Sequence, residues 1–91
     1  MKESSLENKV CKYAEQKGFS QFKLSAIWNA GLPDRLFLYK GKAFFIEFKT
    51  KSGRVSKLQQ LTINEIIAND IPVHIINSIE DGKKLINTYL K

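Results

Sequence analysis

Two short segments of this chain hold the side chains best suited to carry out chemistry. In residues 31–34 a proline directly precedes Asp34, and residues 47–49 begin with Glu47 and end with Lys49. Two carboxylates can hold a hard divalent cation, and an ammonium beside them can neutralise a phosphate or orient a water. Together these three side chains are the minimal set for metal-dependent hydrolysis of a phosphodiester.

The residues around these segments predict two strands, at 34–39 and 42–49. The short turn at Lys40 and Gly41 joins them, which indicates an antiparallel hairpin. Residues 43–46 are apolar on both faces, as in a central strand that is covered on two sides.

The hairpin predicts how the three polar side chains are placed. Side chains alternate along a strand, so Glu47 and Lys49 project from one face, about 7 Å apart. Asp34 pairs near residues 46–48 in such a hairpin, and Pro33 restricts the approach of the backbone. We therefore expect Asp34 beside Glu47, within reach of one cation. Read singly, each of these residues could also be an ordinary charge at a strand end.

The rest of the pattern predicts an alternation of helices and strands. Ser56 and Gln59 have the spacing of a capping box, which marks a helix start. The expected elements are a helix at 5–17, strands at 21–27, 34–39 and 42–49, a helix at 56–69, a buried strand at 73–76 and a last helix from 78. The order α-β-β-β-α-β-α predicts an α/β sandwich around a mixed sheet.

Size and composition indicate one small domain spanning residues 1–91, since 43% of the residues are hydrophobic. No apolar run is long enough for a membrane span, and the first residues lack a secretory pattern. Cys11 stands alone and cannot form an internal disulfide, so we expect a cytoplasmic protein with this cysteine at the edge of the core. The formal net charge of +6 favours a polyanionic partner, although a merely basic surface is the alternative.

Three motifs occur in a characteristic order: Gly-x-Pro-Asp at 31–34, Glu-x-Lys at 47–49 and Ser-x-x-Gln at 56–59. They resemble the VRR-NUC family of the PD-(D/E)xK nuclease superfamily, in the small stand-alone version found in phages and bacteria. The resemblance runs from Glu7 to Gln59, and it implies a restriction-endonuclease-like sandwich. It further implies a Mg²⁺- or Mn²⁺-dependent DNA endonuclease in a bacterial or phage-infected cell, with a preference for branched DNA in some members.

The resemblance assigns roles to the central residues. Asp34 and Glu47 would ligate the metal, with the backbone carbonyl of Phe48 as a further ligand. Lys49 would position or polarise the attacking water and stabilise the charge that develops on the phosphate. A metal-bound water has a lowered pKa, so no histidine base is required. We read His74 as a strand histidine with a satisfied hydrogen bond rather than as a ligand.

Two accessory catalytic positions follow from the same resemblance. Glu7 matches an acidic residue on the first helix, although a solvated glutamate in a first helical turn is the alternative. Gln59 matches the glutamine of the third motif and lies on the helical face of Ile63, Ile66 and Ile67. From there it could order the lysine or a water, or it could serve only as a helix cap.

Basic residues flank these motifs and are candidates for DNA binding. Lys51, Arg54 and Lys57 lie in the loop and helix start after the Glu-x-Lys motif, where flexible cations suit phosphate contacts. Lys23 and Trp28 are further candidates for backbone contact or stacking near a branch point, with a place in the core as the alternative for Trp28. A basic loop can also be simply solvated.

The helix at 56–69 predicts a homodimer because it is apolar on two separated faces, and one small sheet can cover only one of them. The two faces consist of Ile63, Ile66 and Ile67, and of Leu58, Leu61 and Ala68. Two active sites related by a two-fold axis would suit paired cuts in a four-way (Holliday) junction. The alternatives to a nuclease are a non-catalytic nucleic-acid-binding module of the same fold and an assembly protein that uses its basic surface.

Overall fold

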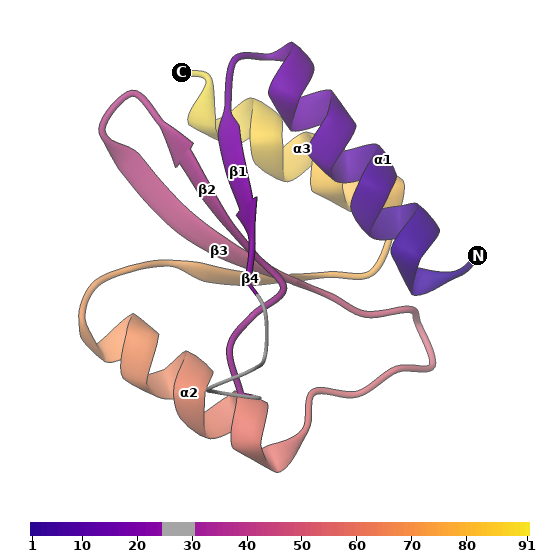
Figure 1. Ribbon diagram of the computed structural model, residues 1–91, viewed down its shortest axis with the longest axis vertical. Coiled ribbons are helices and arrows are strands. Elements are labelled where there is room, and N and C mark those ends of the chain that lie inside the picture. The colour runs from indigo at the N-terminus through magenta and orange to yellow at the C-terminus, as the bar shows by residue number, and fades with distance from the viewer. Residues whose placement is uncertain (25–30) are drawn as a thin grey trace.

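Helices cover both faces of one mixed sheet (Figure 1). The computed structural model describes residues 1–24 and 31–91. Its elements are α1 (Glu3–Gln16), β1 (Ser20–Lys23), β2 (Arg35–Tyr39), β3 (Lys42–Phe48), α2 (Lys57–Ala68), β4 (Val73–Ile76) and α3 (Ile79–Tyr89). In these residues the sheet order is β1-β2-β3-β4, with antiparallel pairing from β1 to β3 and parallel pairing of β3 with β4. The expected order of elements and the mixed sheet are confirmed.

The turn that closes the β2–β3 hairpin lies where the sequence predicts it. Lys40 and Gly41 both have positive φ, at 45° and 81°, which two-residue hairpin turns require. The strand expected at 21–27 is described only as far as Lys23. The part from 25 to 27, like Trp28, lies outside the described residues.

Pro33 explains why β2 begins only at Arg35. Arg35 pairs with Ile46, so the next hydrogen-bonded pair of this ladder would join residue 33 to Phe48. Proline has no N–H and cannot complete that pair. The backbone N–H of Phe48 instead donates to the Asp34 carboxylate, with a distance of 2.8 Å from N to Oδ2.

The main core lies between the sheet and the layer formed by α1 and α3. Phe44, Ile46 and Phe48 of β3 are fully buried on this face. Leu6 and Val10 of α1 cover them and are buried as well. Alternation along β3 therefore leaves Glu47 and Lys49 to the opposite face, on the side of α2.

Helix α2 packs on that opposite face through a narrow stripe. Ile63 is buried, and the neighbouring Thr62 lies so close to Gly31 that a Cβ there would come within 2.4 Å of the threonine Oγ1. This rotation of α2 leaves Ile67 50% exposed, so its expected place on the inward face is wrong.

The exposure of β4 follows from its position in the sheet. Strand β4 is an edge strand, because in the described sheet it pairs only with β3, and Ile75 is 48% exposed. The expectation of a buried strand at 73–76 is therefore wrong.

Within the described segments, no helix has the length and apolar character needed to cross a bilayer.

Candidate active site

Glu47 and Lys49 meet at the end of β3, on the face of the sheet that carries α2. The Lys49 Nζ lies 3.1 Å from Glu47 Oε2, and the Glu47 side chain is only 1% exposed. Burial raises the pKa of Glu47, and the negative charge of Asp34 raises it further. Burial is the largest effect on the pKa of Lys49 and would lower it, but the hydrogen bond to Glu47 and the negative charges of Glu47, Glu3 and Asp34 together outweigh burial and raise this pKa above its ordinary value. Lys49 is therefore a cation near neutral pH and cannot serve as a general base there.

Gln59 reaches the same carboxylate from α2. Its Nε2 donates to Glu47 Oε2 at 2.9 Å, and its Oε1 accepts from the backbone N–H of Ser56 at 3.1 Å. The Ser56 Oγ in turn accepts from the backbone N–H of Gln59, which completes the capping box. One glutamine thus caps the helix and also holds Glu47, so it is not only a cap, and its role in ordering the lysine or a water stays a prediction.

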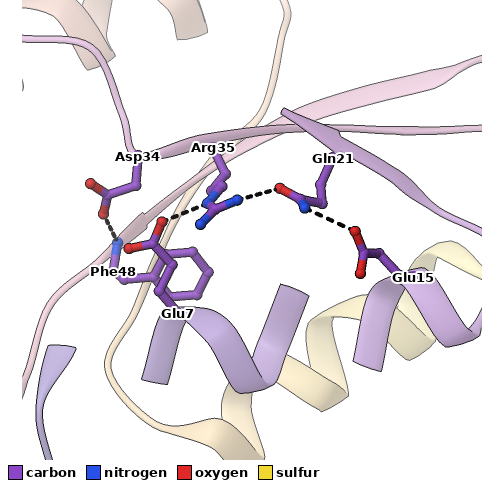
Figure 2. A network of polar contacts seen from close by, with 6 residues as sticks. All are labelled: Glu7, Glu15, Gln21, Asp34, Arg35 and Phe48. Atoms are coloured by element: carbon purple, nitrogen blue, oxygen red, sulfur yellow. Dashed lines mark hydrogen bonds and ion pairs between the residues drawn. The ribbon is translucent and has the colours of Figure 1, made fainter. Parts of the chain in front are cut away.

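Asp34 stands beside Glu47, one step beyond the β2–β3 ladder. Figure 2 shows its carboxylate directed to the backbone N–H of Phe48. Burial raises the pKa of Asp34, and this hydrogen bond opposes the rise. The N–H and C=O of one strand residue point to the same neighbour, so the Phe48 carbonyl also faces this side. The N–H that would have bound this carbonyl is the one that Pro33 lacks.

The donor set fits a hard cation with a small number of protein ligands. Glu47 Oε1 is buried and has no hydrogen-bond partner in the described part of the chain. An ionised oxygen is costly to bury in that state, and a cation would remove the cost. Mg²⁺ is usually held by one or two carboxylates and keeps several waters. The protein ligands could be Asp34, Glu47 and the Phe48 carbonyl. The site would thus contain only two carboxylates, and residues 1–24 and 31–91 hold no group of three or more His, Cys, Asp or Glu that could bind a metal.

Glu7 lies near this site but binds a different partner. Its Oε2 is 2.5 Å from Arg35 Nε, and both side chains are 13% exposed. Arg35 also donates to Gln21 Oε1 at 2.7 Å, and Gln21 donates to Glu15. Figure 2 shows the Arg35 side chain reaching Glu7 on α1, whereas the Asp34 carboxylate is directed to the backbone N–H of Phe48. The alternative of a freely solvated Glu7 is therefore wrong, and its negative charge contributes, after burial, to the raised pKa of Asp34.

Arg35 was not predicted from the sequence, although a signal for it exists. Alternation puts Arg35 on the same face as Phe37, which is fully buried. A charge on a buried face needs a partner. The helix that covers this face could therefore have been searched for an acidic partner; it offers Glu3, Glu7 and Glu15, and Glu7 is the one that meets Arg35.

The remaining candidates are placed but make no contact with the carboxylates. Lys51, Arg54 and Lys57 are exposed in the loop after β3 and at the start of α2. Lys23 is exposed at the end of β1, opposite Arg35. His74 lies on the edge strand, where its Nε2 is 2.8 Å from the hydroxyl of Tyr89, as expected for a satisfied strand histidine.

Comparison with known proteins gives one line of evidence. No protein-family model and no curated protein matches this sequence. The fold is similar to a solved structure described as "VRR_NUC domain", with a TM-score of 0.85 and 25% sequence identity. The similarity covers 96% of each chain, so it extends over nearly the whole fold.

Proposed function

We propose that this chain, which belongs to the VRR-NUC family, is a metal-dependent DNA endonuclease with Asp34, Glu47 and Lys49 as its PD-(D/E)xK residues. One observation carries the proposal. The Glu47 carboxylate is buried between Lys49 and Gln59 beside a second carboxylate, and one of its oxygens meets no protein donor among the described residues. A structural ion pair would not need a buried carboxylate oxygen without a donor, whereas Mg²⁺ or Mn²⁺ would bind such an oxygen.

Each residue then has a defined task. Asp34, Glu47 and the Phe48 carbonyl would hold the cation, which supplies Lewis acidity and a bound water of lowered pKa. Lys49, as an ammonium, stabilises the negative charge that develops on the phosphate and helps to position the attacking water. Gln59 keeps Glu47 in place, which is the usual task of a residue behind a metal ligand. Glu7 is an accessory acid that acts on Asp34 through its charge.

We further propose that the exposed cations around the site bind the DNA backbone. Lys51, Arg54 and Lys57 follow the catalytic strand, and Lys23 lies at the same end of the sheet as Asp34. Such contacts position a duplex without reading its sequence, which suits selection of branched DNA by shape.

The exposed side of α2 supports a homodimer. Leu58 and Leu61 are 51% and 63% exposed, and Ala68 is exposed on the same helix. A second copy would bury these apolar side chains and could direct two sites at one junction. Sedimentation at micromolar concentration tests this, since a monomeric mass, or an unchanged dimer in Leu61→Glu, would contradict it.

The activity itself is tested by cleavage of supercoiled plasmid and of four-way junctions. We expect cutting with Mg²⁺ or Mn²⁺, none with chelator, and none in Asp34→Asn. Asp70→Asn is a matched control, because it makes the same chemical change just beyond the C-terminal end of α2, away from the site. Asp70 has a φ of 64°, which asparagine tolerates. Activity that persists in chelator or in Asp34→Asn would reject the site. DNA binding without any cleavage would instead support the non-catalytic module.

A further inference from the structure

Two acidic side chains of α1, Glu7 and Glu15, are turned toward residues of the sheet. Glu7 binds Arg35 there, and Glu15 accepts a hydrogen bond from Gln21 at 3.0 Å (Figure 2). The outer face of this helix is thereby left to basic residues. Their positive charge is not neutralised by the acids of their own helix.

A groove between α1 and α3 collects these basic residues. The α1–α3 groove has a volume of about 190 Å³ and is lined by Lys9, Lys12, Tyr13, Gln16, Ile79 and Lys83. The Tyr13 ring is held in place, since its hydroxyl donates to Asn87 Oδ1 at 2.7 Å. Two ammonium groups lie against this ring, Lys17 Nζ at 5.3 Å and Lys83 Nζ at 5.2 Å from its centroid.

Among the described residues, no acid of α3 lines this groove. Glu80 is paired with Lys84 at 3.4 Å, in an exposed contact. Asp81 is the remaining acid of α3 and lies in its first turn. A groove that gathers lysines from two helices is complementary to a chain of phosphates.

A larger hollow lies between the loop that follows Lys49 and the start of α3. The edge cavity has a volume of about 520 Å³ and is lined by Met1, Leu6, Thr50, Lys51, Ser52, Asn77, Ser78 and Ile79. Thr50 and Lys51 directly follow Lys49 in the chain. Ile79 lines both hollows, so they adjoin at this residue.

We propose that the edge cavity and the α1–α3 groove bind an unpaired nucleic-acid strand that leaves the catalytic edge. The cavity is mainly apolar, with an amide and hydroxyl groups, and can take bases, while the lysines of the groove can take phosphates. Unpaired bases can enter the apolar cavity while their phosphates meet the lysines, whereas the bases of a duplex are paired and stacked, so the two hollows together suit one strand. The inference rests on the proposed function for the position of the cut, but strand binding itself needs no catalysis.

Binding measured in chelator tests the proposal without cleavage. The probes are a labelled oligothymidine, a blunt duplex and the same duplex with a single-stranded extension. Lys12→Ala/Lys83→Ala removes one groove lysine from each helix, and Lys40→Ala/Lys91→Ala removes the same charge at the hairpin turn and the C-terminal residue. We expect the groove variant to weaken binding of oligothymidine and of the extended duplex about tenfold, and to lower the salt slope by about 1.4, for two contacts to a single strand.

The control variant and the blunt duplex decide the outcome. Binding of the blunt duplex should change less than about twofold in the groove variant, because the proposed site contacts only the unpaired strand and the loss of two charges weakens general attraction only slightly, as in the control variant. Equal losses in both variants, equal losses for blunt and extended duplex, or unchanged oligothymidine binding in the groove variant would each overturn the proposal. If no metal supports cleavage but the strand-specific loss remains, the proposed function fails while this inference stands.

Discussion

Gln59 on α2 donates a 2.9 Å hydrogen bond to Glu47 Oε2 on β3, the same oxygen that Lys49 contacts at 3.1 Å. Two donors thus hold one oxygen of the carboxylate and leave Oε1 for another partner. One oxygen of this side chain is thus held by the protein, while the other is available to the proposed cation. The capping box of α2 fixes the position of the supporting amide.

Comparison of Gln59→Ala with Ser56→Ala separates the two roles of this glutamine. Each variant removes part of the capping box, so each should lower the free energy of unfolding by about 0.5–2 kcal/mol. Only Gln59→Ala releases Glu47, and it should weaken metal binding or cleavage by about 10–100-fold. Urea unfolding and metal titration of cleavage rates measure the two effects. A similar loss of cleavage in Ser56→Ala would show that the cap alone matters.

The pH dependence of stability should reveal the buried carboxylates. Burial raises the pKa of both Asp34 and Glu47, so the folded chain binds protons more tightly than the unfolded chain. Their contribution to stability is therefore fully present below the unfolded pKa values and is lost as the pH rises through the raised ones. Thermal unfolding of the metal-free protein should show this slope, and Glu47→Gln should flatten it. A steeper slope in that variant would contradict the prediction.

Magnesium should act in the opposite direction, because it binds the ionised carboxylates. At neutral pH the melting temperature should rise with Mg²⁺ concentration, and the rise should disappear at acid pH, where Asp34 and Glu47 are protonated. Asp34→Asn should show no rise at any pH. Asp70→Asn, with its substitution at the far end of α2, should respond to Mg²⁺ like the unmodified protein.

Arg35→Ala tests the pair that supports α1. It leaves Glu7 at 13% exposure without its cation, and should lower the free energy of unfolding by about 1–3 kcal/mol. Lys84→Ala removes an exposed pair with Glu80 and should cost less than about 0.5 kcal/mol. Equal effects in urea unfolding would mean that the Arg35 pair is no better than a surface contact.

Gly82→Ala tests the close packing of α3 on α1. A Cβ there would lie 2.4 Å from Val10 Cγ2, so the clash should outweigh the better helix propensity of alanine and cost about 1–3 kcal/mol. Val10→Ala makes room for it, so the double variant should lose less than the sum of the two single variants. If the losses of the two single variants add strictly in urea unfolding, residues 82 and 10 are not in the close contact described here.

Local rules account for the parts of the fold that were predicted. Strand alternation predicts that Glu47 and Lys49 share a face, and the turn at Lys40 and Gly41 sets the hairpin register that brings Asp34 opposite Glu47. These rules act over a few residues and leave little room for alternatives. The family resemblance was likewise readable from short motifs.

Contacts between distant elements were not predictable in the same way. The partner of Arg35 depends on how α1 crosses the sheet, and the exposure of Ile67 depends on how α2 is rotated about its axis. Periodicity names an apolar stripe but does not say which part of it meets the sheet. The close approach of Gly31 to Thr62 sets that rotation, and no local pattern encodes it.

The amino-acid order by itself determined the carboxylate pair, the lysine and the strands that carry them, because side-chain alternation and turn geometry are properties of neighbouring residues. Only the tertiary structure decided that Gln59 holds Glu47, that Glu7 binds Arg35 and that lysines of two helices line one groove. Those relationships depend on the angle and rotation at which helices pack, and that is a property of the whole core.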